Sequence, residues 1–281
     1  MNVLDMDKRT HILAALVEGN SIRATCWMTE AAKNTVTKLL RDIGRVCAEY
    51  QDETLRDLSC KRIECDEIWS FCYKKQKNVR DDEWNRPYGD VWTYVGIDVD
   101  TKLVPSWIIG QRHAGCARPF IEDLASRLRN RVQLTTDGHR PYLEAVAGAF
   151  GDQIDYAMLV KLYGPDTNAK GGDKRYSPAK CNGTRRTIVT GNPDMKHVST
   201  SYIERQNLTM RMSMRRFTWL TNAFSKKVEN LEHAVALHFM HYNFCRIHQT
   251  LGTTPAVAAG VADRAWKIED IVRLLEKAES N

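Results

Sequence analysis

The segment 62–73, RIECDEIWSFCY, constrains the fold most, because helical periodicity gives way there to a strand pattern. It alternates in polarity and is rich in β-forming residues, so we expect a strand. The pattern downstream predicts a strand, a strand, a helix, a strand, a helix and a strand, at 91–98, 103–110, 117–129, 132–136, 141–150 and 154–160. A meander followed by alternating helices and strands predicts an α/β fold with a mixed five-stranded sheet and flanking helices.

The first 50 residues are predicted to be all-α. Helices at 6–18, 21–28 and 31–50 are separated by short turns, which is the helix-turn-helix pattern. The third helix opens with polar and basic side chains that could reach bases or phosphates, namely Lys33, Asn34, Thr35 and Lys38. A plain or dimerising three-helix bundle is the alternative, and we favour a DNA-binding domain over 1–50.

The remaining chain divides by composition. Residues 51–60 are polar and predict a linker, and 61–260 hold the α/β domain. Within that domain, 163–200 is rich in glycine, proline and charge and too long for an ordinary connector, so we expect an exposed basic insertion loop that orders on its partner. Helices are expected at 200–217 and 222–242, and 261–281 should form a C-terminal helix.

The predicted helix 200–217 has two distinct sides. Ile203, Leu208 and Met212 recur at a spacing that leaves an apolar stripe. The other side carries one acid among polar and basic residues, namely Glu204, Asn207, Arg211 and Arg215. A carboxylate ringed by arginines indicates a metal ligand held beside a polyanion. The alternative is a capping box, in which Glu204 folds back on Ser201 at the helix start.

Two more acids stand where a shared site needs them. Asp66 lies within the first strand, where aspartate is disfavoured, and Asp137 follows the fourth strand. Asp137 precedes Gly138, so a simple turn is its alternative role. Glu64 and Glu67 are possible substitute ligands. Converging carboxylates suit one or two Mg²⁺ ions, which support in-line phosphoryl transfer at a DNA phosphodiester.

Charge and composition limit the classes of partner that the protein is expected to bind. The net charge is +6, and residues 161–227 hold 14 lysines and arginines against 4 aspartates and glutamates, so the remainder is slightly acidic. Such clustering favours a phosphate-rich partner. The eight cysteines form no C-x-x-C pair, so we expect free thiols and no zinc finger. No apolar run suits a membrane span or a signal segment, so we expect a cytoplasmic protein.

Three segments resemble a known family. CDEIWSF, TTDGHRPYLEAV and YIERQNLTMRMSMRRF are similar to the signature blocks of DDE transposases of bacterial insertion sequences, in particular the insertion-sequence-one family. The wider superfamily tends to place a lysine or arginine seven residues after the glutamate, where this chain has Arg211. The resemblance covers residues 60–260. Unlike some members, this chain has no zinc-binding set of cysteines. Recognition of the DNA ends is therefore assigned to the predicted three-helix domain, residues 1–50.

The resemblance implies a ribonuclease-H-like fold and an enzyme that cuts and joins the ends of its element. Asp66, Asp137 and Glu204 would be the catalytic residues and the ligands of Mg²⁺ or Mn²⁺. The partners would be the terminal inverted repeats, target DNA and further copies of the chain, in the bacterial nucleoid and away from membranes. DNA contacts are expected from the late helix, namely at Asn207, Arg211, Arg215 and Arg216. From their places in the sequence, Trp84 and Trp219 are candidates for stacking on bases, with a packing role as the alternative. The alternatives are a nuclease that cuts without joining and a non-catalytic DNA-binding regulator.

Overall fold

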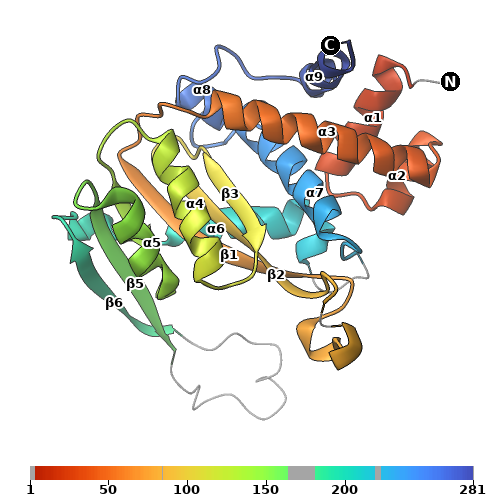
Figure 1. The fold of residues 1–281 in the computed structure, drawn as a ribbon. Helices are drawn as coiled ribbons and strands as arrows, with labels where there is room; N and C mark the ends of the chain where they lie inside the picture. The colour runs from red at the N-terminus through yellow and green to blue at the C-terminus, as the bar shows by residue number, and fades with distance from the viewer. Residues whose placement is uncertain (1–3, 84, 164–180, 219–222, 281) are drawn as a thin grey trace.

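The computed structural model describes residues 4–83, 85–163, 181–218 and 223–280 (Figure 1). Its strands are β1 (Arg62–Cys72), β2 (Gly89–Asp98), β3 (Ser106–Gly110), β4 (Gln133–Thr136), β5 (Asp155–Tyr163) and β6 (Cys181–Thr190). Its α-helices are α1 (Met6–Val17), α2 (Ile22–Thr29), α3 (Lys33–Thr54), α4 (Ala114–Arg127), α5 (Pro141–Phe150), α6 (Ser201–Ser213), α7 (Val228–Met240), α8 (Pro255–Ala258) and α9 (Ile268–Ser280).

The strands form one mixed sheet with the order β3-β2-β1-β4-β5-β6. β1, β2 and β3 pair antiparallel as a meander, and β4 and β5 continue the sheet in parallel with β1. This confirms the predicted α/β class, a mixed sheet with flanking helices and a helical N-terminus. The central strand β1 is hydrogen-bonded to β2 on one side and to β4 on the other, which fixes the positions of its residues.

In the described part of the chain the sheet has six strands, so the expected count of five was wrong. β6 lies inside the predicted insertion loop 163–200 and pairs antiparallel with β5. Nearly all of its residues are exposed, so it lacks the alternation of buried and exposed positions by which strands are recognised in a sequence. Residues 164–180 of the predicted loop lie outside the described part of the chain.

Helices cover both faces of the sheet (Figure 1). Asp66, Val95 and Trp107 lie opposite one another on neighbouring strands and therefore share a face. α6 contacts this face through Asp66, and α7 packs on it through Phe239 against Trp107. Alternation along β1 turns Glu67 to the other face, which α4 and α5 cover. The candidate site is therefore on the α6 side.

The N-terminal helices share their core with the sheet. α3 continues to Thr54, into the segment 51–60 that the composition predicts as a linker. The buried Gln51 side chain donates to the carbonyl of Ala236 on α7 at 3.1 Å. Arg127 of α4, also buried, donates to the Asp52 carboxylate at 2.7 Å and to the Leu55 carbonyl at 3.2 Å. These contacts hold the long helix α3 against the α/β body.

Two further sequence expectations concern thiols and membranes. All eight cysteines are free, as expected. Within the described ranges, every helix falls short of the length or the apolarity that crossing a bilayer requires.

Candidate active site

Strand register brings the first two acids together. β1 and β4 run parallel, and their last paired residues are Cys65 and Thr136. Asp66 and Asp137 are the next residues on their chains, so they follow the end of this pairing side by side. Asp137 is held by the backbone N–H of His139, which donates to its Oδ1 at 2.9 Å. Asp137 therefore does stabilise a turn through Oδ1, which was the alternative role considered for it. Its second oxygen, Oδ2, accepts a hydrogen bond from Arg112.

The third acid arrives on α6, which is bonded to β1 at two points. The buried Glu64 carboxylate accepts the backbone N–H groups of Tyr202 and Ile203, at 2.8 and 3.0 Å. One turn further along, Asn207 Nδ2 donates to Asp66 Oδ2 at 2.9 Å. Because Glu64 and Asp66 are two residues apart on one strand face, they fix both the start and the rotation of the helix. Glu64 thus anchors α6, and its Oε2 atom accepts both of these hydrogen bonds.

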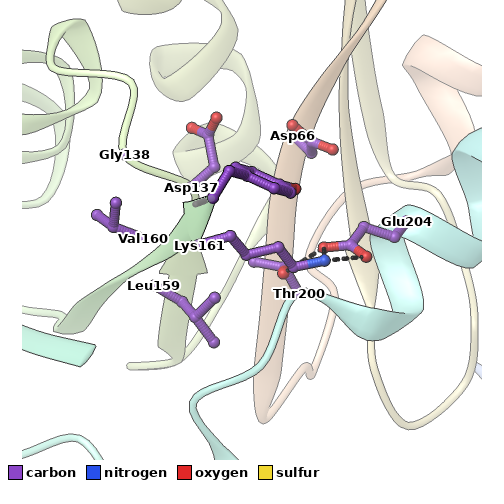
Figure 2. A pocket seen from close by; sticks show the side chains of 9 residues that line it. Asp66, Asp137, Gly138, Leu159, Val160, Lys161, Thr200 and Glu204 are labelled. Carbon is purple, nitrogen blue, oxygen red and sulfur yellow. Dashed lines mark hydrogen bonds and ion pairs between the residues drawn. The ribbon is translucent and has the colours of Figure 1, made fainter. Parts of the chain in front are cut away.

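Glu204 is held by groups of the pocket wall. Thr200 Oγ1 donates to its Oε1 at 2.7 Å, and the Lys161 ammonium lies 2.5 Å from both carboxylate oxygens. The helix begins after Thr200, so Ser201 is its first residue and not its cap. The capping box considered for Ser201 and Glu204 is therefore not formed. Glu204 points across the pocket, toward β5 (Figure 2).

Asp66, Asp137 and Glu204 line one pocket of about 420 Å³. Figure 2 shows the first two carboxylates near its upper rim and the Glu204 carboxylate facing Lys161 across it. The other walls are Gly138, Leu159, Val160, Lys161, Tyr163 and Thr200. Three acids that are far apart in the sequence thus reach a common cavity, as the sequence predicts, while their catalytic roles stay predictions.

A tighter acidic group lies at one side of this pocket. Among the described residues, Asp66, Glu67 and Asp137 place carboxylate oxygens within 4.8 Å of one another. Glu204 is outside that group. Arg112 bridges two of its members, because Nε donates to Glu67 Oε2 at 3.1 Å and Nη2 to Asp137 Oδ2 at 3.3 Å. The Glu67 side chain is only 1% exposed, and Arg112 forms an ion pair with it.

The proximity of these acids changes their acidity. Burial, and then the negative charges of Asp137 and Glu67, raise the pKa of the Asp66 carboxyl to about 7. Burial and the charge of Asp137 also raise the pKa of Glu67. A raised pKa means that the ionised carboxylates repel one another and lack solvation. The group therefore favours a bound cation or proton.

The donor set fits a hard divalent cation. Mg²⁺ and Mn²⁺ prefer oxygen ligands, and a few carboxylates leave room for water and phosphate oxygens. Asp66 and Asp137 offer close oxygens, and a cation between them would relieve the repulsion that raises the pKa of Asp66. Glu204 could join from the opposite wall only if it exchanged its contact with Lys161.

The residues predicted to bind DNA are placed differently from one another. Lys33, Asn34 and Lys38 are exposed at the start of α3, as a DNA-reading helix needs, and Thr35 is half-buried there. The turn before α3 is made by Glu30, whose φ of 52° is left-handed. These positions are compatible with the helix-turn-helix prediction, which no contact in this structure tests.

The predicted basic face of 200–217 is interrupted. α6 ends at Ser213, and Met214 is extended before a 3₁₀ turn (Arg215–Phe217), so Arg215 leaves the helical face although it stays exposed. Arg216 turns inward and donates to the Ser225 hydroxyl at 2.9 Å, and burial lowers its pKa to about 10. Arg211 stays on α6, partly buried.

Asn207 also differs from its predicted role. It is 3% exposed and its amide donates to Asp66, so in this structure its side chain orients an acid. Trp84 and Trp219, the two candidates for stacking on bases, lie outside the described residues.

Sequence reasoning missed Lys161 and Arg112 as members of the site. Lys161 follows the buried run of β5, a strand parallel to β4 and its neighbour in the sheet. Side chains at the carboxyl ends of adjacent parallel strands share an edge, so Asp137 and Lys161 could have been placed together. Arg112 lies in the short connection between β3 and α4, where its sequence gives no comparable signal.

Comparisons with known proteins add little. No family model matches the chain, and no curated protein matches it. Among solved structures, the Mos1 mariner paired end complex with Mn is similar over 85% of this chain and 77% of its own, at 11% identity and a TM-score of 0.26. A pre-cleavage Mos1 transpososome is similar over the same shares, at 10% identity and a TM-score of 0.24. Likeness this slight carries no argument, so the site is judged on its own geometry.

Proposed function

We propose that the protein is a DDE-type transposase that cuts and joins insertion-sequence DNA ends. The observation that supports this most is the convergence of Asp66, Asp137 and Glu204, from a strand, a strand end and a helix, on one pocket. The motifs that carry these acids resemble those of the insertion-sequence-one family. The proposal includes a bacterial cytoplasm as the place of action.

In this proposal Asp66, Asp137 and Glu204 would hold Mg²⁺ or Mn²⁺. The ions would activate the attacking oxygen and stabilise the leaving oxygen at a DNA phosphodiester. The protein's part is geometric: Glu64 anchors α6, Asn207 orients Asp66, and Arg112 holds Asp137. Fixed ligands of this kind keep the reacting atoms in line and lower the cost of ordering them.

The DNA would be bound on two surfaces. The exposed start of α3, with Lys33, Asn34, Thr35 and Lys38, would recognise the terminal inverted repeats. Arg211 on α6 and Arg215 in the 3₁₀ turn after it would contact phosphates of the ends or of target DNA. Since two ends must be joined together, at least two copies of the chain would act in one assembly.

The test is strand cleavage and transfer with end-containing DNA in Mg²⁺. The wild type should cut at the ends and produce joined products, whereas Asp66→Asn and Asp137→Asn should lose both by more than about 100-fold, since ligand loss removes the metal. Asp263→Asn, which changes an exposed acid far along the chain, is the matched control and should stay active. Cleavage without joining would point to a nuclease, and binding without cleavage to a regulator.

DNA binding by the N-terminal helical domain is tested separately. Lys33→Ala and Lys38→Ala should each weaken binding to all DNA sequences and lower the salt dependence of the affinity, because each removes a phosphate contact. An unchanged salt dependence in both variants would contradict the assignment of α3 to DNA.

A further inference from the structure

Lys161 is the cationic side chain in contact with Glu204. It extends from β5 into the pocket, and its ammonium lies 2.5 Å from both Glu204 oxygens (Figure 2). Lys161 and Glu204 are 32% and 40% exposed, so the pair is neither fully buried nor fully solvated. Thr200 donates to the same carboxylate at 2.7 Å. Two groups of the pocket wall, an ammonium and a hydroxyl, therefore hold the Glu204 carboxylate.

This contact has a consequence for the other acids. Glu204 lines the same pocket as Asp66 and Asp137 but lies outside the close group that they form with Glu67. A divalent cation shared by all three would need the oxygen atoms that the ammonium now occupies. A positive side chain at that place both competes for the ligand and repels the ion.

We propose that Lys161 alternates between two partners, the Glu204 carboxylate in the metal-free protein and a phosphate oxygen of bound DNA when Glu204 binds a metal ion. The inference rests on the proposed function. A lysine suits this exchange because its four-carbon chain is flexible and its ammonium binds carboxylate and phosphate oxygens alike. Thr200 keeps its hydrogen bond to Glu204, so the carboxylate stays oriented while its cation changes.

The alternative is a purely structural ion pair that ties α6 to β5. The two roles predict opposite changes in metal affinity. If Lys161 competes with the metal, its removal tightens Mn²⁺ binding. If it only positions Glu204, its removal frees the glutamate and weakens Mn²⁺ binding.

The experiment measures the Mn²⁺ affinity of the full-length protein without DNA, by electron paramagnetic resonance of free Mn²⁺. Lys161→Ala should bind Mn²⁺ about tenfold more tightly, because a nearby like charge is removed. Lys161→Arg should stay close to the wild type. Lys196→Ala removes an exposed charge on the 3₁₀ helix Met195–His197 and is the matched control, with no expected change. Thermal unfolding of each variant checks that it folds.

A second variant pair assigns the effect to Glu204. In a Glu204→Gln background, Lys161→Ala should tighten Mn²⁺ binding by clearly less than tenfold, since only the like charge is removed and there is no carboxylate left to free. With saturating metal, Lys161→Ala should still cleave end-containing DNA about tenfold more slowly and with a raised KM, because a charge-assisted phosphate contact is lost. Tighter metal binding together with weaker DNA use is the expected signature.

The outcomes separate this inference from the proposed function. If Glu204→Gln weakens Mn²⁺ binding but Lys161→Ala leaves it equal or weaker, the exchange is refuted and the metal site stands. If the wild type binds no Mn²⁺ and cuts no DNA, both are refuted.

Discussion

Asp66 is a candidate metal ligand, and its buried carboxyl group also destabilises the folded protein. Its pKa is raised from 3.8 to about 7, first by burial and then by the charges of Asp137 and Glu67. Between these values the folded protein keeps a proton that the unfolded chain has released. The folded state is therefore progressively destabilised as the pH rises through this window, and the full cost is present above pH 7.

This predicts a variant that is more stable and inactive. In EDTA at pH 8, Asp66→Asn should raise the free energy of unfolding by about 2–3 kcal/mol, because it removes a buried charge while keeping an acceptor for Asn207. At pH 4 the gain should be small. Urea denaturation at the two pH values measures the difference. Equal stability at both, or a less stable variant at pH 8, would contradict the electrostatic account.

Asn207 provides the second residue-scale prediction. Its amide donates to Asp66 Oδ2 from a buried position, so Asn207→Ala should leave that oxygen without its hydrogen bond, and the carboxylate held only through Oδ1 by the backbone N–H of Glu67. We expect a loss of about 10–100-fold in metal affinity or cleavage rate, the usual effect of removing a hydrogen bond to a metal ligand. Mn²⁺ titration measures it. Leu208→Ala, on the exposed side of α6, is the matched control. Equal losses in the two variants would refute a specific role.

At the scale of elements, α6 shows why part of the site could not be predicted. Of the three residues of the expected apolar stripe, Ile203 is buried, but Leu208 and Met212 are 40% and 74% exposed. The buried side carries Ile203, Gln206, Asn207 and Met210. Hydrophobic periodicity assigns polar side chains to solvent, but here β1 presents Glu64 and Asp66 to the helix, and polar residues are needed to satisfy them. Sequence patterns fail where function places polar groups inside.

The same helix gives an element-scale prediction about its anchor. Glu64→Gln keeps an oxygen that can accept the N–H groups of Tyr202 and Ile203, so it should cost less than about 1 kcal/mol of stability. Glu64→Ala leaves both N–H groups without that acceptor and should cost about 2–4 kcal/mol. Urea denaturation compares the two. A glutamine variant as unstable as the alanine variant would show that charge, and not hydrogen bonding, holds α6.

For the whole molecule, the sequence predicts the order of elements and the class of sheet well. β1, β4 and α5 match their expected ranges within one or two residues because each has a clear pattern. Pairing between segments that are far apart in the sequence is harder to predict from that sequence. The register of β1 with β4, the anchoring of α6 and the contact of Lys161 with Glu204 depend on long-range geometry that local periodicity does not encode.

The packing of α3 on α7 is another such contact. Gly44 of α3 lies against His233 of α7, where an added Cβ would come within 2.4 Å of the His233 Cβ and 2.6 Å of its backbone. The close approach joins the candidate DNA-reading helix rigidly to the body that carries the acids. A recognition helix fixed in this way would place bound DNA at a set distance from the pocket.

Gly44→Ala should therefore destabilise the whole protein, although alanine favours a helix by about 1 kcal/mol over glycine. The clash has backbone atoms on one side, so the helices must separate, and overpacking of this kind costs about 1–3 kcal/mol. Gly148→Ala, in α5 where an added Cβ would have nothing within 4 Å, is the matched control and should be stabilising. Thermal unfolding and limited proteolysis of both variants measure the contrast. If Gly44→Ala is as stable as Gly148→Ala, α3 and α7 are not closely packed in solution, and the head moves independently of the pocket.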